Sequence, residues 1–325
     1  MKNLFKAFGI IVLVILIHAP IWAQNWKALK DIKFGKNEVC SSIAYGSNRF
    51  VAISRLKMFT SIDGIIWTSV DVSKIFGTGS FDGTCAVVYG NDMFVAVGLG
   101  GKMATSKDGL IWKAVANSKF GTGIISAITF GNGTFVAAGE NGKIASSKDG
   151  VTWTAVDASK IFGTTGQRID SMAFGNGKFV AFDYNGRMGV STNGTTWTAV
   201  NLIDEIKNNV KVIAFGNNRF VLGGFHGTIA TSTDGVTWTK LNVSKVLNEN
   251  DSIQAIVFGN GKFIAGGDYG KLLTSKDGVT WTAMSNSPFE SYQMNVVSAI
   301  GYGNRKFIAT CGGYASEFKM AYLQE

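Results

Sequence analysis

Histidine, proline and cysteine are scarce in this chain of 325 residues, which contains two, two and three of them. Only His226 among the histidines lies beyond the first 23 residues, which excludes metal sites with several histidine ligands. No combination of residues suggests a catalytic set, so we expect no catalytic residues, no metal and no cofactor. With so little proline, the 41 glycines indicate tight turns rather than disordered segments.

The three cysteines, Cys40, Cys85 and Cys311, are an odd number. One disulfide with a free thiol and three buried thiols both agree with this count. A zinc site built from two of them is not expected, because no histidine lies near them in the sequence.

The first 23 residues have the pattern of an export signal. Lys2 and Lys6 come first, an apolar run over Phe8–Ile17 follows, and Ala23 offers a small residue at the cleavage position. The apolar run is too short for a membrane span. We therefore expect residues 1–23 to be removed and the mature protein to be secreted or periplasmic, without a membrane span.

The chain is basic, with a formal net charge of +9, but its lysines form no stripe. Lys107, Lys148 and Lys276 are typical, because each stands alone beside an aspartate. Such dispersed charge indicates a solvated surface, and we expect no nucleic-acid partner. The basic surface still suits an acidic protein or an anionic glycan.

A segment containing Ser-x-Asp-Gly-x-x-Trp recurs six times, once with Asn in place of Asp. The copy at 126–156 reads SAITFGNGTFVAAGENGKIASSKDGVTWTAV. The tryptophans that mark the repeat are 41 to 45 residues apart: Trp67, Trp112, Trp153, Trp197, Trp238 and Trp281. A repeat of roughly 40–50 residues that holds four short strands is typical of a β-propeller blade.

Within the copy at 126–156, turns rich in glycine and asparagine separate four predicted strands. The strands cover Ser126–Gly131, Thr134–Gly139, Lys143–Ser147 and Val151–Val156. Their β-branched and aromatic residues fit strands that pack between neighbouring sheets. No stretch beyond the export signal has a convincing helical period, so the expected fold class is all-β.

The two ends of the chain predict how the ring closes. A seventh copy begins at Ser298 but lacks the Ser-x-Asp-Gly-x-x-Trp segment. Trp26 lies 41 residues before Trp67, which is the spacing of a preceding repeat. We predict that Asn25–Leu29 forms the outermost strand of the last blade, which removes an open sheet edge. Residues 24–325 are then one seven-bladed propeller with four-stranded blades.

The recurring segment resembles the Asp-box, also called the bacterial neuraminidase repeat. In that family the box is structural and lies at the periphery of each blade. The resemblance therefore implies a structural role for the residue at the acidic position of each copy. These residues are Asp63, Asp108, Asp149, Asn193, Asp234 and Asp277.

Among Asp-box proteins, the chain resembles the exported, single-domain, seven-bladed propellers of the photosystem II assembly-factor type. It matches sialidases poorly, because it has no Phe-Arg-Ile-Pro segment and no credible triad of arginines. The resemblance implies a non-catalytic binding platform, with a protein or a glycan as partner, and we expect a monomer. The alternative is a glycan-active hydrolase or lyase that uses paired carboxylates on the binding face.

Propeller ligands usually bind on the face that carries the turns between the second and third strands of each blade. In the fourth to sixth repeats these turns place aromatic and carboxylate side chains in matching positions. The candidate ligand-binding residues are Asp183, Tyr184, Phe225, His226, Asp268 and Tyr269. A further possibility is a set of exposed aromatic pockets in the connections between repeats, at Phe76, Phe120 and Phe162.

Overall fold

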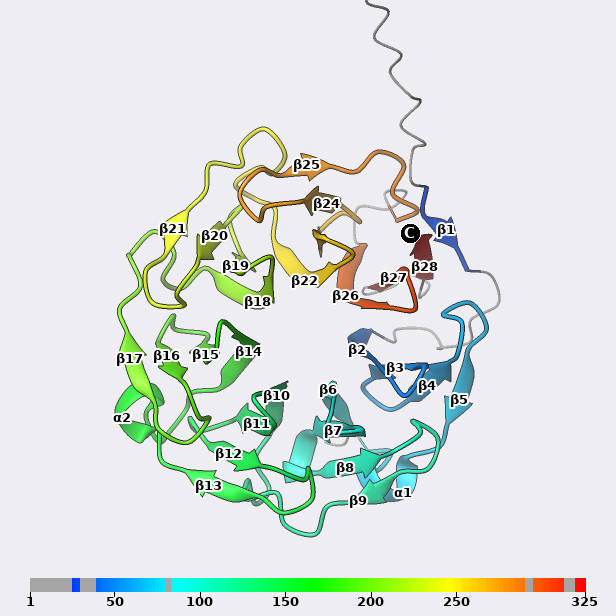
Figure 1. Cartoon of the computed structure of the whole chain (residues 1–325), viewed down its shortest axis with the longest axis vertical. Helices are drawn as coiled ribbons and strands as arrows, with labels where there is room; N and C mark the ends of the chain where they lie inside the picture. The colour runs from blue at the N-terminus through cyan, green and yellow to red at the C-terminus, as the bar shows by residue number, and fades with distance from the viewer. Residues whose placement is uncertain (1–24, 30–38, 80–82, 290–294, 313–318) are drawn as a thin grey trace, which may run out of the picture.

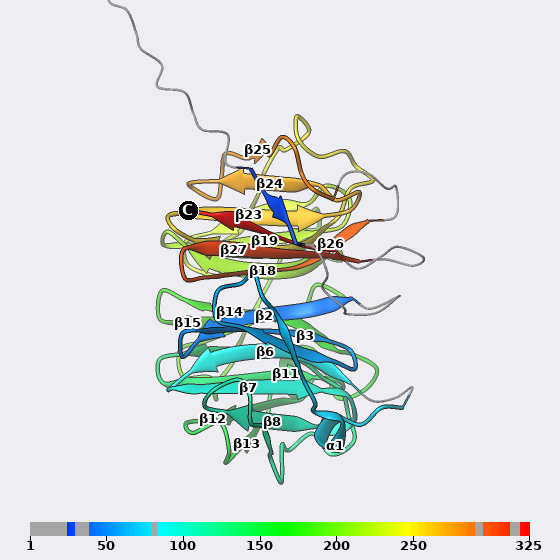
Figure 2. The ribbon, with the colours of Figure 1, turned by 90° about the vertical axis from the view of Figure 1, so that its right-hand side faces the viewer.

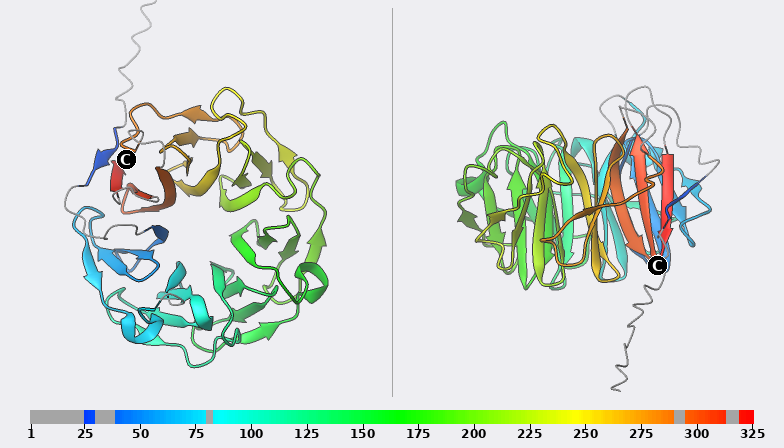
Figure 3. Two further views of the ribbon diagram at one scale, coloured as in Figure 1. Left: turned by 180° about the vertical axis from the view of Figure 1, so that it is seen from behind. Right: turned by 90° about the horizontal axis from the view of Figure 1, so that it is seen from above.

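The computed structural model describes residues 25–29, 39–79, 83–289, 295–312 and 319–325. These residues form seven four-stranded antiparallel sheets, arranged as blades around one axis (Figure 1). Seen edge-on, the ring is a disc whose strands run from one face to the other (Figure 2 and Figure 3). The prediction of an all-β, seven-bladed propeller is confirmed. The export signal expected over residues 1–23 lies outside the described residues.

Six blades are each built from four consecutive strands, called A to D from the axis outward. Blades 1 to 3 contain β2 (Cys40–Gly46), β3 (Arg49–Ser54), β4 (Met58–Ser61) and β5 (Thr68–Val70); β6 (Thr84–Gly90), β7 (Met93–Gly98), β8 (Met103–Ser106) and β9 (Lys113–Ala114); β10 (Ile125–Gly131), β11 (Thr134–Gly139), β12 (Ile144–Ser147) and β13 (Thr154–Val156). Blades 4 to 6 contain β14 (Ile169–Gly175), β15 (Lys178–Asp183), β16 (Met188–Ser191) and β17 (Thr198–Val200); β18 (Val210–Gly216), β19 (Arg219–Gly224), β20 (Ile229–Ser232) and β21 (Thr239–Lys240); β22 (Ile253–Gly259), β23 (Lys262–Gly267), β24 (Leu272–Ser275) and β25 (Thr282–Ala283).

The seventh blade joins the two ends of the chain, as predicted. Its inner strands are β26 (Val296–Gly303), β27 (Lys306–Gly312) and β28 (Lys319–Gln324), and its outer strand is β1 (Lys27–Ala28). Lys27 pairs with Tyr322 in antiparallel register. The backbone amide of Leu29 donates to the carbonyl oxygen of Met320 at 2.8 Å. This strand closes the ring, because it covers the edge that β28 would otherwise expose.

The aromatic-glycine pair at the end of each strand A packs neighbouring blades together. Gly131 lies so close to the ring of Phe174 in the next blade that a β-carbon at Gly131 would overlap it. The same contact recurs around the ring and closes between Gly303 of blade 7 and Tyr45 of blade 1. The repeated dipeptide therefore encodes the contact between blades, and glycine is needed there for close approach.

Two short helices, α1 (Ser73–Phe76) and α2 (Ser159–Phe162), lie in the connections between blades, and the 3-10 turn η1 (Leu99–Gly101) lies between β7 and β8. Each of six connections buries one large apolar side chain in the core. These residues are Phe76, Phe120, Phe162, Ile206, Leu247 and Phe289, all at most 4% exposed. The expectation of exposed aromatic pockets at Phe76, Phe120 and Phe162 is therefore wrong, because burial of these rings is what holds the connections against the blades.

The three cysteines are free thiols. Cys40 and Cys311 are buried, and Cys85 is half-buried at the inner edge of blade 2. Burial raises the pKa of Cys40 to about 12, so its thiol stays protonated at neutral pH. The odd number of cysteines left two alternatives, one disulfide with a free thiol or three thiols, and the structure has three thiols.

Candidate functional site

The two faces of the ring carry different turns. On one face, the Nδ2 of Asn91 in an A–B turn donates to the carbonyl oxygen of Lys148 in the next blade's C–D turn, at 2.9 Å. On the other face, B–C turns pair with the connections between blades, as where the Glu140 amide donates to the Ile124 carbonyl oxygen at 2.9 Å. We call these the C–D face and the B–C face.

On the C–D face, the Ser-x-Asp-Gly turns are held by their own side chains. Oδ1 of Asp149 accepts hydrogen bonds from the backbone amides of Val151 at 2.8 Å and Thr152 at 2.7 Å. The hydroxyl of Ser147 accepts one from the Gly150 amide at 2.9 Å. Because these amides serve the turn, the observed outer strand begins at Thr154 rather than at the predicted Val151.

The same network recurs where asparagine replaces aspartate. Oδ1 of Asn193 accepts from the amides of Thr195 and Thr196, both at 2.9 Å. Hydrogen bonds from the Thr152 amide, with others from the same turn, lower the pKa of Asp149 to about 2 despite partial desolvation. The Asp149 carboxylate is therefore occupied by hydrogen bonds to backbone amides of its own turn, which fits a structural role rather than a ligand site.

On the B–C face, the turns share a backbone shape but differ in sequence. In several blades both central residues have positive φ, as in a type I′ turn. The first of the two is Gly100 in blade 2, Asn141 in blade 3, His226 in blade 5 and Tyr269 in blade 6. Glycine and asparagine adopt this conformation readily, whereas a bulky side chain such as that of Tyr269 does so at a cost of about 1–2 kcal/mol.

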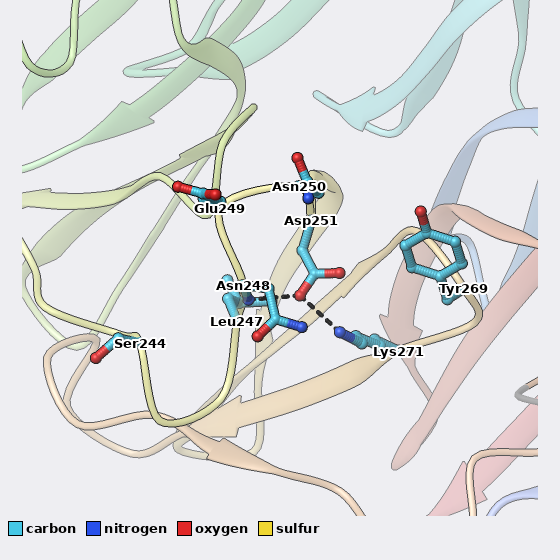
Figure 4. A pocket seen from close by; sticks show the side chains of 8 residues that line it. All are labelled: Ser244, Leu247, Asn248, Glu249, Asn250, Asp251, Tyr269 and Lys271. Carbon is cyan, nitrogen blue, oxygen red and sulfur yellow. Dashed lines mark hydrogen bonds and ion pairs between the residues drawn. The ribbon is translucent and has the colours of Figure 1, made fainter.

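Tyr269 stands at the edge of a groove of about 760 Å³ on the B–C face (Figure 4). The other wall is the connection between blades 5 and 6, which contributes Ser244, Asn248, Glu249 and Asn250. Tyr269 is 45% exposed, and the four polar residues are also exposed. The groove thus offers an aromatic face opposite hydrogen-bonding groups.

A buried carboxylate fixes the shape of this groove. Asp251, almost fully buried, accepts through Oδ2 from Nζ of Lys271 and from the backbone amide of Asn248, both at 2.6 Å. Nζ of Lys271 also lies 5.8 Å from the centre of the Tyr269 ring. The backbone carbonyl oxygen of Asp251 accepts from the Gly227 amide at 2.7 Å. Asp251 therefore ties the connection to the B–C turns of both blade 5 and blade 6.

A second groove, of about 420 Å³, lies on the other side of the same connection. It is lined by His226 of the blade 5 turn, by Lys240 to Val243, and by residues that also line the first groove. Glu249 and Asn248 belong to both grooves. The connection between blades 5 and 6 therefore separates the two grooves. The predicted residue Tyr269 lies at the edge of the first groove, and the predicted residue His226 lies at the edge of the second.

The remaining predicted residues are placed differently. Tyr184 is 63% exposed, Phe225 and Asp268 are half-buried, and none of the three lines either groove. Asp183 is fully buried, and its carboxylate forms an ion pair with Nε of Arg187 at 2.6 Å while it accepts from the Asn185 amide. Buried and paired in this way, Asp183 shapes its own turn, so we leave it out of the proposed binding surface.

A third cavity, of about 590 Å³, lies on the axis, where the first residues of the innermost strands meet. Strand A carries a register irregularity at the same point in all seven blades. The extra residue lines the cavity in every blade; the seven are Ser41, Cys85, Ser126, Asp170, Lys211, Gln254 and Ser298. Sequence reasoning missed this ring, although an alignment of the repeats shows that this position varies from serine to aspartate, lysine and glutamine while its neighbours stay small or apolar.

Comparison with known proteins supports the fold. Residues 201–310 match the family model described as the DUF6242 beta propeller domain. No curated protein sequence matches the chain. The resemblance to seven-bladed propellers of the assembly-factor type is confirmed at the level of the fold by a structure of YCF48 bound to D1 peptide. That structure has a TM-score of 0.69 and 16% identity, and the match covers 95% of this chain and 100% of that one.

Other solved propellers are similar to the same extent. A catalytically inactive virginiamycin B lyase from Staphylococcus aureus, with quinupristin, has a TM-score of 0.71 and 12% identity, covering 93% of this chain and 98% of that one. The extracellular domain of BT4673 from B. thetaiotaomicron has a TM-score of 0.67 and 14% identity, covering 93% and 40%. These structures include a peptide complex, a lyase and an extracellular domain, so the likeness describes the fold and not one activity.

Proposed function

We propose that this protein is an exported, non-catalytic propeller that binds a protein partner through the B–C face of blades 5 and 6. The observation that carries the proposal is Tyr269, an exposed aromatic residue in a left-handed backbone conformation at the edge of a groove. Costly backbone conformations are retained at functional sites when they place a side chain. Blades 2 and 3 have Gly100 and Asn141 at this position, so the fold itself does not require a tyrosine.

The surroundings of Tyr269 suit a peptide segment. Aromatic residues dominate the energetics of protein interfaces, and a partly exposed ring in a groove is a typical anchor point. The exposed amides of Asn248 and Asn250 and the carboxylate of Glu249 offer hydrogen bonds to a partner backbone along the groove. The YCF48 structure shows that a propeller of this fold accommodates a peptide.

Export is supported by the sequence of residues 1–23 and by the similarity to the extracellular domain of BT4673. No helix among the described residues is long and apolar enough to cross a membrane.

The test compares two variants that change opposite faces. Wild-type protein, Tyr269→Asn with His226→Asn, and Asp149→Asn are immobilised and exposed to the exported proteins of the source organism. Partners retained by the wild type are identified by mass spectrometry and titrated by calorimetry. The double variant should weaken the affinity at least tenfold, about 1.4 kcal/mol, whereas Asp149→Asn should leave it unchanged.

Two outcomes contradict the proposal. Equal affinity of the double variant and the wild type would move the binding surface away from blades 5 and 6. Retention of defined glycans on an array, with no protein retained and with loss of binding in the double variant, would keep the site but replace the protein partner by a glycan.

A further inference from the structure

We infer that the axial cavity is a separate binding site for a small zwitterion, an apolar α-amino acid. The inference rests on two oppositely charged residues at equivalent places. Asp170 and Lys211 are the extra residues of the innermost strands of blades 4 and 5, which are neighbours in the ring (Figure 1). Both side chains line the cavity. The groove on the B–C face contains neither residue, so this site is independent of the proposed protein-binding surface.

The carboxylate of Asp170 is held in place but retains hydrogen-bonding capacity. Nε and Nη2 of Arg168 both contact Oδ1 of Asp170 at 2.7 Å. The Asp170 side chain is 10% exposed, whereas that of Arg168 is 48% exposed. Among the described residues, Oδ2 of Asp170 has no hydrogen-bond partner. Arg168 fixes the carboxylate through Oδ1, and Oδ2 can still accept a hydrogen bond from the ammonium group of a ligand.

Lys211 is the complementary group. It is half-buried in the cavity, and within the described part of the chain its ammonium group forms no ion pair or hydrogen bond. A lysine that lines a cavity without a partner among the described residues has its ammonium group available to a ligand carboxylate. Together with Arg168 and Asp170 it gives the described charges of the lining a net value of +1, which favours a ligand carboxylate.

The lining next to these charges is apolar. One and two residues further along the innermost strands, the cavity is lined by Ala127, Ile128, Met172, Val212, Ile256 and Ile300. Neutral polar groups at the same level as the charges come from Ser298 and Gln254. A ligand that places its ammonium group at Asp170 and its carboxylate at Lys211 can therefore direct an aliphatic side chain toward the isoleucines. The volume of about 590 Å³ lies within the range of small-molecule sites.

The experiment uses three probes that differ by one group. L-leucine carries both charges, 4-methylpentanoate lacks the ammonium group, and 3-methylbutylamine lacks the carboxylate. Binding to the full mature protein is measured by calorimetry and by ligand-observed NMR. Leucine should bind at least tenfold more tightly than either singly charged probe.

Two variants assign each charge to its residue. Asp170→Asn should weaken leucine at least tenfold and leave 4-methylpentanoate unchanged, whereas Lys211→Met should weaken both. Lys245→Met, which changes an exposed lysine outside the cavity, is the matched control and should bind all probes as the wild type does. Thermal melting verifies that each variant is folded.

The inference is overturned if leucine at 10 mM does not bind, or if Lys211→Met binds it as tightly as the wild type. Equal affinity for leucine and 4-methylpentanoate would also overturn it, because the site would then be a carboxylate site without a role for Asp170. These results do not test the proposed protein-binding surface. Tyr269 and His226, which its variants change, do not line the axial cavity.

Discussion

The C–D face repeats one hydrogen-bond network in six blades, while the B–C face changes its side chains from blade to blade on a shared backbone. On the C–D face even Asn193 accepts the same two amide hydrogen bonds as Asp149. On the B–C face the equivalent turn position runs from Gly100 through Asn141 to Tyr269. The C–D turns are constrained by the hydrogen bonds that the turn needs, whereas the B–C turns include Tyr269, a residue that the turn does not favour.

This difference separates two reasons for a residue to be present. A residue that satisfies backbone amides contributes to folding wherever the repeat occurs, so it recurs. A bulky residue that adds backbone strain to a turn needs another reason to be present, and at Tyr269 the adjoining groove supports the proposal of a recognition role. This comparison supports the proposal that the C–D turns serve the scaffold and that the B–C face of blades 5 and 6 serves recognition. The following predictions test each half of this assignment.

The largest effect is expected at a core anchor beneath the B–C face. Phe120 is fully buried in the connection between blades 2 and 3. Phe120→Ala removes a buried ring and leaves a cavity, so the free energy of unfolding should fall by about 3–5 kcal/mol. Urea denaturation measures it, with Thr122→Ala, an exposed change in the same connection, as control. A loss below 1 kcal/mol would mean that these connections are not part of the core.

A smaller effect is expected from the C–D turn. Asp149→Ala removes the acceptor of two backbone amides and should lower the free energy of unfolding by about 1–3 kcal/mol. Asp149→Asn should lower it by less than the alanine variant does at pH 7, because Asn193 shows that an amide oxygen maintains the network, whereas the contribution of the carboxylate charge is lost. Equal destabilisation by alanine and asparagine would show that charge, not hydrogen bonding, holds the turn.

The pH dependence of stability follows from the same carboxylates. The pKa of Asp149 is lowered from 3.8 to about 2 in the folded chain, and that of Asp234 is also lowered to about 2. Their stabilising contribution is complete above the ordinary pKa and is lost as the pH falls from about 4 to 2. Asp149→Asn should therefore show a shallower loss of stability than the wild type over this interval, measured by denaturation at each pH. An identical slope would contradict the assignment of that pKa shift.

The repeat predicts the fold because its spacing, its glycine turns and its tryptophans are all local features. The position of Trp26 even predicts the closing strand, since a missing segment at one end must be supplied by the other. Sequence reasoning fails where the outcome depends on neighbours in space. It reads Phe120 and Asp183 as surface residues, but the first is covered by the adjoining blades and the second by Arg187.

The candidate site could be predicted only in part for the same reason. Tyr269 and His226 are visible in the sequence as unusual turn residues. Asp251 and Lys271, which fix the groove, come from a connection and a strand start that no motif marks. The axial ring depends on seven register irregularities, which appear only once the strands are paired.

The free energy of unfolding of Tyr269→Asn tests the central claim most directly, because it requires no ligand. If Tyr269 is retained for recognition at the expense of the turn, asparagine, which accepts a φ of 60° readily, should raise the stability by up to about 1 kcal/mol in urea denaturation. Asp149→Asn on the opposite face should show no such gain. A fall in stability of Tyr269→Asn by 1 kcal/mol or more would show that Tyr269 serves the scaffold, and would contradict the assignment of recognition to this face.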